Sequence, residues 1–68
     1  MPRYFFHSHT RDRVIRDQTG LDLPALARSE DPEMTMALWY EVIIQHIQRN
    51  QSLVVTDETG KVVFVAGG

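Results

Sequence analysis

The chain has 68 residues, a formal net charge of −2 and no cysteine. This length accommodates one domain, residues 1–68, and so small a domain buries only about 60% of the surface of its unfolded chain. The lack of cysteine excludes disulfides, thiolate zinc sites and cysteine nucleophiles. The longest apolar run covers residues 62–66, whereas a membrane-spanning helix needs about 20. We therefore expect a cytoplasmic protein with no membrane partner.

Charge is unevenly distributed along the chain. Residues 1–16 contain four arginines and one aspartate, whereas residues 17–68 contain three bases and eight acids. Nonspecific nucleic-acid binding needs a broad basic face, which an acidic chain with one basic hairpin does not offer, so we expect no nucleic-acid partner. The same asymmetry suits an oriented contact with a protein, including a second copy of this chain.

The first predicted element is a strand over residues 3–9, because the segment is rich in aromatic side chains. Alternation places Tyr4 and Phe6 on one face and Phe5 and His7 on the other. Residues 13–16 form a short return strand. The following turn, residues 17–20, has Asp at its first position and Gly at its fourth, which is typical of a β-turn.

The middle of the chain predicts one main helix. Pro24 suits the first turn of a short helix. Asp31 can cap a new helix that has Pro32 at its first position and that ends at Arg49. Alternatively, residues 24–49 form one helix that bends at Pro32.

A second hairpin follows, with strands over residues 53–56 and 61–66 and a turn over residues 57–60. The last strand is apolar on both faces, which is normal for a central strand, so we expect it beside the first strand. The predicted fold is α+β, a ββαββ hairpin–helix–hairpin, with a four-stranded sheet and one main helix packed on one face.

The predicted helix carries two apolar stripes. The stripe expected to lie on the sheet consists of Met36, Tyr40, Ile43, Ile44 and Ile47, with Ala37 and Trp39 at its edges. A second stripe, on the opposite side, consists of Met34, Leu38 and Val42. Either the leucines of residues 21–26 fold over this second stripe, or it forms an interface, since an exposed apolar patch usually marks one.

The sheet offers another candidate interface, because Phe5, His7 and either Phe64 or Val63 lie on the face predicted to be away from the helix. The leading hypothesis is a non-enzymatic interaction module that forms a homodimer or binds a protein partner. It associates through the second helix stripe or through this open sheet face.

Side chains that could carry chemistry are few. His7 and His9 share one face of a strand, but a zinc site needs three or four converging ligands, so we expect no metal and no cofactor. The two Asp-x-Thr-Gly segments, residues 17–20 and 57–60, have the composition of turns and are not expected to form a catalytic site. The chain contains neither a glycine-rich phosphate loop nor a nucleophile elbow. No small-molecule substrate or enzymatic activity is expected.

The C-terminal residues Phe64-Val65-Ala66-Gly67-Gly68 support an alternative. This tail resembles that of ubiquitin-like and sulfur-carrier proteins, which have a β-grasp fold. The resemblance implies a carrier that acts through Gly67 and Gly68.

Three segments together are similar to a family of short bacterial proteins of unknown function: Met1-Pro2-Arg3-Tyr4-Phe5-Phe6-His7, Asp17-x-x-Gly20-x-x-Leu23-Pro24 and Val55-Thr56-Asp57-Glu58-x-Gly60-Lys61-Val62. Members open with M-P-R-Y-F-F and end in a V-x-D-x-x-G hairpin. They usually have an alanine- and arginine-rich helix directly after Leu-Pro, whereas this chain has Ser29-Glu30-Asp31-Pro32. The resemblance implies no activity and no functional residues.

Overall fold

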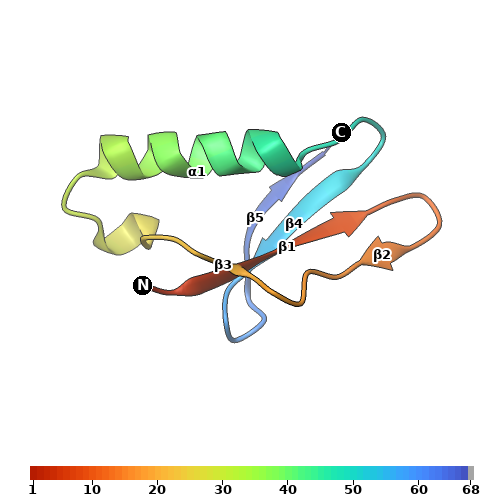
Figure 1. Cartoon of the computed structure of the whole chain (residues 1–68), viewed down its shortest axis with the longest axis horizontal. Coiled ribbons are helices and arrows are strands. Elements are labelled where there is room, and N and C mark those ends of the chain that lie inside the picture. Colours follow the sequence, from red (N-terminus) through yellow and green to blue (C-terminus); the bar gives the residue numbers. More distant parts are fainter. Residues whose placement is uncertain (68) are drawn as a thin grey trace.

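The computed structural model describes residues 1–67 and has an α+β fold, with one α-helix lying over an antiparallel sheet (Figure 1). The elements in chain order are β1 (Arg3–His9), β2 (Val14–Ile15), β3 (Leu21–Asp22), the 3₁₀-helix η1 (Leu26–Arg28), α1 (Pro32–His46), β4 (Ser52–Thr56) and β5 (Val62–Ala66).

The sheet has five strands, in the order β2-β1-β4-β5, and β3 pairs with β1 outside this path. The expectation of four strands is therefore wrong. The additional strand forms because the turn after β2 returns the chain along β1, where Asp22 lies opposite Arg3 and Leu21 lies opposite Tyr4. A two-residue strand has no periodicity by which the sequence could reveal it.

The position of the last strand also differs from the prediction. β4, not β5, lies beside β1, with Val55 opposite Phe6 and Phe64 opposite Val55. Leu53 and Val55 in β4 are 2% and 0% exposed, whereas β5 lies at the edge and Val62 to Val65 are all exposed. The apolar character of β5 on both faces therefore does not reflect burial within this chain.

Both predicted turns are confirmed, and an aspartate organises each of them. The Asp17 carboxylate accepts hydrogen bonds from the backbone N–H groups of Thr19 and Gly20, and Asp57 accepts one from Thr59. Gly20 has a φ of 76° and Gly60 a φ of 88°. Glycine adopts such positive values without the steric cost of a Cβ.

The start of α1 is as predicted. Asp31 caps it by accepting a hydrogen bond from the Met34 N–H at 3.2 Å, and Pro32 is its first residue. Ser29 Oγ and Thr35 Oγ1 form a hydrogen bond that ties the preceding loop to the first turn. The helix ends at His46, three residues before the predicted end.

The side of α1 that faces the rest of the chain agrees only in part with the predicted stripe, since Ile43 of the stripe and Trp39 at its edge are buried and the other stripe residues are exposed. The buried helix residues are Thr35, Trp39 and Ile43. Trp39 sets this orientation, because its Nε1 donates to the Pro24 carbonyl oxygen at 2.8 Å and its ring lies 4.6 Å from that of Tyr4. Met36 and Tyr40 are consequently 62% and 67% exposed.

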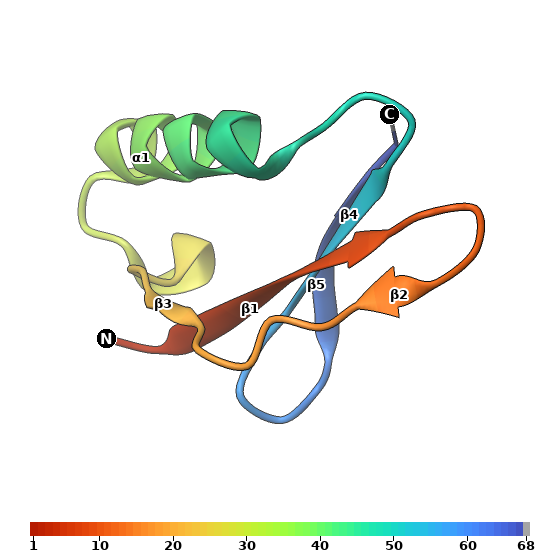
Figure 2. The ribbon, with the colours of Figure 1, turned by 45° about the vertical axis from the view of Figure 1, so that its right-hand side comes forward.

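The core lies between α1 and the face of the sheet that carries Tyr4 and Phe6, so the predicted alternation along β1 is confirmed. The β1–β2 hairpin projects away from the helix (Figure 2). The radius of gyration is 12.0 Å, against about 11 Å expected for a compact domain of this length. The buried apolar residues among those described are Tyr4, Phe6, Leu23, Trp39, Ile43, Leu53 and Val55.

Candidate interaction surface

An apolar groove of about 550 Å³ lies between α1, the segment around η1 and β5. We call it the α1–β5 groove. Its walls contain no charged side chain. The lining residues are Tyr4, Ala25, Leu26, Ala27, Met36, Trp39, Tyr40, Ile43, Ile47, Val63 and Phe64.

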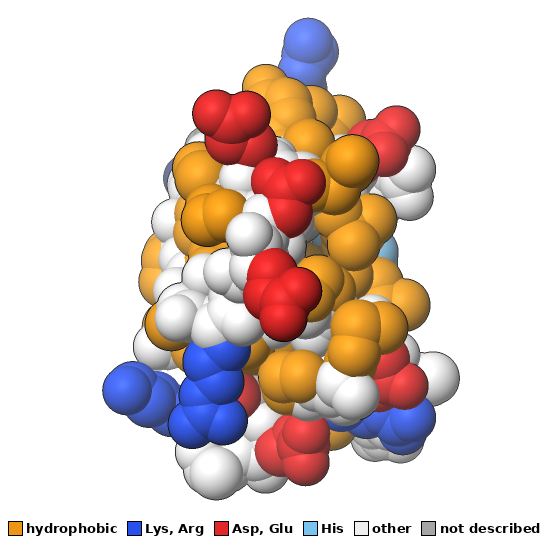
Figure 3. Space-filling model, turned by 90° about the vertical axis from the view of Figure 1, so that its left-hand side faces the viewer, with side chains coloured by type: hydrophobic (Ala, Val, Ile, Leu, Met, Phe, Trp, Pro, Cys, Tyr) orange, Lys and Arg blue, Asp and Glu red, His pale blue; other side chains and the backbone are white. Residues whose placement is uncertain are grey.

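The groove is lined by side chains that normally fill a core. Tyr40 and Met36 on the helix are more than half exposed, and Val63 and Phe64 on β5 are 44% and 39% exposed. Figure 3, a view from the left of Figure 1, shows hydrophobic side chains on the surface among acidic ones. Across the described residues, fifteen large hydrophobic side chains are exposed and seven apolar residues are buried. Exposed apolar side chains that gather in one place often mark a contact with another molecule.

The groove results from the orientation of α1. Trp39 and its bond to Pro24 rotate α1 so that Ile43 points into the core. The side of the helix that carries Met36 and Tyr40 then overhangs β5 without covering it.

The second helix stripe does not belong to the α1–β5 groove. Met34 is 69% exposed and Leu38 41% exposed, whereas Val42 is half-buried and packs partly against the core. Leu23 is buried in the core, but the neighbouring Leu21 and Leu26 remain exposed. The leucine segment thus adds one residue to the core and leaves Met34 and Leu38 in solvent.

Phe5 and His7 are half-buried on the sheet face away from α1. Their rings stack in parallel, with centroids 6.4 Å apart. Phe64 lies on the other face, since it is opposite Val55, which is in turn opposite Phe6. Phe64 therefore does not share a sheet face with Phe5 and His7.

Both ring nitrogens of His7 are hydrogen-bonded. Nδ1 accepts from the Asp17 N–H at 3.0 Å, so the proton of the neutral ring sits on Nε2 and is donated to Thr56 Oγ1, also at 3.0 Å. His7 thereby joins the turn after β2 to β4. This bonding indicates a structural role and leaves neither nitrogen free for a metal.

The histidines do not converge. His46 Nδ1 donates to the Val42 carbonyl oxygen, and its ring stacks on Phe6, with centroids 4.7 Å apart, on the face opposite His7. Within residues 1–67, no three His, Cys, Asp or Glu side chains are grouped as metal ligands.

The Asp17 carboxylate accepts three hydrogen bonds, all from backbone N–H groups. Burial alone would raise its pKa, but hydrogen bonds from the N–H groups of Phe6, Gly20 and Thr19 outweigh that effect and hold the pKa below its ordinary value. The carboxylate therefore stays ionised at neutral pH as the anchor of a turn, and it is unsuited to act as a general acid.

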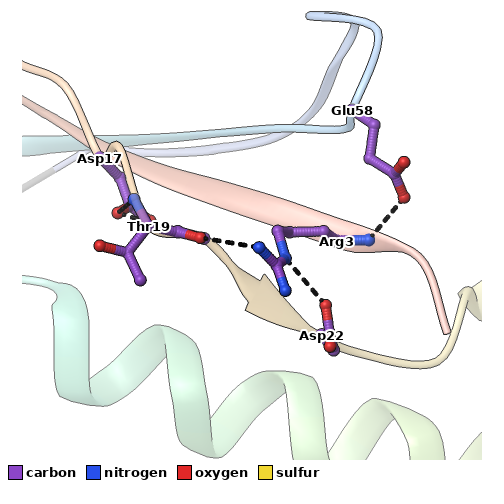
Figure 4. Close-up of polar contacts among 6 residues, drawn as sticks. Arg3, Asp17, Thr19, Asp22 and Glu58 are labelled. Carbon is purple, nitrogen blue, oxygen red and sulfur yellow. Dashed lines mark hydrogen bonds and ion pairs between the residues drawn. The ribbon is translucent and has the colours of Figure 1, made fainter.

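Arg3 connects three separate segments (Figure 4). Its N–H donates to Glu58 in the β4–β5 turn at 2.8 Å, and its Nε donates to Asp22 in β3 at 3.0 Å. The guanidinium also reaches the Thr19 carbonyl oxygen at 3.5 Å. The bond from Arg3 and its positive charge lower the pKa of Asp22. These contacts fasten the β3 strand and the last turn to β1.

The residues of the α1–β5 groove were not predicted as a site from the sequence, although the apolar signal was there. The apolar pattern predicts Met36, Tyr40 and Ile47 on the sheet, and it predicts Val63 and Phe64 in a central strand with one of the two on the open sheet face. The sequence contains more apolar residues than one small core can bury, and only this excess indicated an apolar surface.

The C-terminal carrier residues lie at the limit of the described chain. Gly67 follows β5 directly, is exposed, and has no heavy atom within 4 Å of the position that a Cβ would take. Gly68 lies outside the described residues. In the part of the chain that the structure describes, no helix is long and apolar enough to cross a bilayer.

Comparison with known proteins yields a family and no described activity. No curated protein and no solved structure matches the chain. The family model that does match covers residues 3–66, which include every helix and strand of the fold. This chain therefore belongs to the family of the domain of unknown function DUF6894.

Proposed function

We propose that this chain is a non-enzymatic protein-interaction module that self-associates through the α1–β5 groove. The observation that carries the proposal is the groove itself, where Met36, Tyr40, Val63 and Phe64 are 39–67% exposed around an uncharged hollow. Fully burying one such side chain contributes about 1.5–3 kcal/mol, so covering several of them offsets a substantial part of the cost of association.

The size of the core supports the same conclusion. Seven buried apolar residues form the core of the described chain, and a domain below about 70 residues commonly needs oligomerisation, metals or disulfides to reach useful stability. Cysteine is absent, and the histidines are dispersed over opposite faces of the sheet. A second chain is the remaining way to enlarge the apolar core.

Matched substitutions on the helix distinguish the two candidate surfaces. Tyr40→Glu places a charge in the α1–β5 groove, and Leu38→Glu places one in the second stripe; both positions are exposed. We expect sedimentation equilibrium to show a dimer for the wild type and for Leu38→Glu, and a monomer for Tyr40→Glu. Circular dichroism should show the same helix content in all three.

The other outcomes are equally informative. Loss of association in Leu38→Glu alone would move the interface to Met34 and Leu38. An unchanged dimer in both variants would direct attention to Phe5 and His7 on the opposite face. A wild type that stays monomeric at all concentrations would overturn the proposal.

The alternative of a carrier that acts through Gly67 and Gly68 draws support from one feature, the exposed and unobstructed Gly67 directly after β5. Deleting both glycines would abolish a carrier function and leave self-association intact. A mass increase of the C-terminus that matches a thiocarboxylate, in protein purified from its own host, would favour the carrier.

A further inference from the structure

We propose that two copies join by antiparallel pairing of β5 with β5 of the second copy, through the backbone of Val65. This inference rests on the proposed self-association and specifies its geometry. The pairing would make one continuous sheet from two copies, with β2 of each copy at its two ends, and would bring a second β5 to the open side of each α1–β5 groove.

The two edges of the sheet differ in a way that indicates which one is paired. Natural proteins protect free edges by keeping them short and by placing charges on them. The β2 edge follows this rule, since it has two residues between the exposed Arg13 and Arg16. The β5 edge has five residues, Val62–Ala66, with no charge and no proline.

The hydrogen bonds of β1 show which backbone groups of β5 point outward. The Phe6 N–H donates to Asp17, and the N–H of Thr10, the residue directly after β1, donates to the Arg13 carbonyl oxygen, so the backbone groups of even-numbered β1 residues point away from β4. In an antiparallel pair, bonded and non-bonded positions alternate. Val55, opposite Phe6, therefore points its backbone groups toward β5 and bonds with Phe64.

The backbone N–H and C=O groups of the next residue of β5 point in the opposite direction from those of Phe64. Val65, opposite Val54, directs its N–H and C=O to the open edge. The register shifts between Val55 and Thr56, which leaves Val63 as an extra residue of β5. The segment from Phe64 to Ala66 keeps a regular register, and Val65 lies at its centre.

A second copy fits this edge for two reasons. Antiparallel self-pairing around Val65 places no charges opposite one another, because residues 62–66 are all apolar, and like charges in that position are destabilising. Each copy also brings an identical unprotected edge and an identical groove, so a twofold pair covers both at once and leaves free only the edges formed by the two-residue strands β2 and β3.

The pairing explains the groove as well as the edge. A strand added to β5 lies about 4.8 Å from it. It extends the floor on which Val63 and Phe64 already lie, beneath Met36 and Tyr40 of α1. The second copy's apolar β5 thereby supplies the surface that this side of α1 lacks.

Amide hydrogen exchange of the wild-type protein tests the geometry directly. The matched control is Val14, opposite His9 at a non-bonded position, whose N–H faces solvent at the β2 edge. We expect exchange at Val65 to slow by about 15-fold when the total chain concentration is raised to 100 times the dissociation constant, because about 7% of the chain is then monomeric, whereas Val14 exchanges fast throughout. Fast exchange at Val65 in a proven dimer would overturn the strand pairing.

Proline substitutions provide the second test, because proline lacks the N–H and is tolerated at edge positions that face solvent. Val65→Pro should convert the dimer to a monomer that retains the wild-type circular dichroism and Trp39 fluorescence. Val14→Pro, the equivalent change at the other edge, should remain a dimer. A dimeric, folded Val65→Pro would overturn the inference.

These results separate the inference from the function on which it rests. If Tyr40→Glu dissociates the dimer and Val65→Pro does not, then the groove is the interface and the β5 edges are not paired. A wild type that is monomeric by sedimentation overturns both. Loss of the dimer in Tyr40→Glu and Val65→Pro, with Val14→Pro unchanged, supports both.

Discussion

Gly20 and Gly60 occupy equivalent positions in the two turns but differ in their surroundings. A Cβ added at Gly20 would lie 2.7 Å from Arg3 Cγ and 2.9 Å from Phe5 Cε1, whereas one added at Gly60 would meet nothing within 4 Å. Both residues have positive φ, which costs an L-residue roughly 1–2 kcal/mol. The steric cost is thus specific to Gly20.

We predict that Gly60→Ala lowers the free energy of unfolding by about 1 kcal/mol. Gly20→Ala should lower the free energy of unfolding by about 1–3 kcal/mol more than Gly60→Ala does, because Phe5 and Arg3 must move. Urea unfolding at one fixed chain concentration measures both. Equal decreases in the free energy of unfolding would show that Arg3 and Phe5 accommodate the added methyl group without cost.

Asp17 makes stability depend on pH at the acidic end. Its pKa in the folded chain is lowered from the ordinary value of 3.8, so its contribution is complete above that value and is lost as the pH falls through the folded-state pKa. Asp17→Asn replaces one acceptor oxygen with a donor, and it should cost about 1–3 kcal/mol at pH 7. The difference from the wild type should shrink below pH 3.8 in urea unfolding measured across pH; a constant difference would contradict this account.

At the level of the elements, α1 is held in place by few contacts. Trp39 joins it to the segment before η1 through the Pro24 carbonyl oxygen, and to β1 through the ring of Tyr4. Trp39→Phe leaves the Pro24 oxygen without its donor and should lower the free energy of unfolding by about 1–3 kcal/mol. Tyr40→Phe, at the adjacent exposed position, should change it by less than about 0.5 kcal/mol. Denaturation followed by circular dichroism makes the comparison.

The cap of α1 gives an independent prediction. Asp31→Ala removes the acceptor for the Met34 N–H and should destabilise the chain by about 1 kcal/mol. Glu30→Ala, at the exposed neighbouring position, should have an effect within about 0.5 kcal/mol. Thermal unfolding of the two variants tests the cap, and equal melting temperatures would show that it contributes nothing.

Features that depend on near neighbours in the chain were predicted from the sequence. The Asp17 and Asp57 turns, the Asp31 cap and the faces of β1 each follow from residues that lie within a few positions. The orientation of α1 was not predicted, because it depends on a carbonyl oxygen 15 residues away from Trp39.

Sheet order was mispredicted for a different reason. A strand that is apolar on both faces, such as β5, is expected wherever both faces are covered, and the sequence does not say by which chain. The groove residues Met36 and Tyr40 present the same ambiguity. Residues buried within one copy and residues buried between copies have the same apolar pattern in a sequence. The candidate surface could therefore be identified only from the fold.

For the whole molecule, self-association links stability to concentration. If folding and dimerisation are coupled, a tenfold rise in chain concentration stabilises the folded dimer against unfolding by about 1.4 kcal/mol. With an unfolding entropy of about 2.1 cal/mol/K per residue in two chains, it raises Tm by roughly 5 °C. Differential scanning calorimetry over a hundredfold concentration range measures this. A Tm independent of concentration would contradict the coupling.

The central place of β1 has a consequence for the synthesis of this protein. β1 pairs with β4, and the His7–Thr56 bond joins residues 49 positions apart. A ribosome that adds about 5–20 residues per second takes roughly 2–10 s to make the intervening chain. During that interval Tyr4, Phe6 and Trp39 have been translated, but the strand that completes their core does not yet exist. The nascent chain therefore passes through a stage in which these core residues are not yet covered by β4, and the core is completed only when the last third of the chain has emerged.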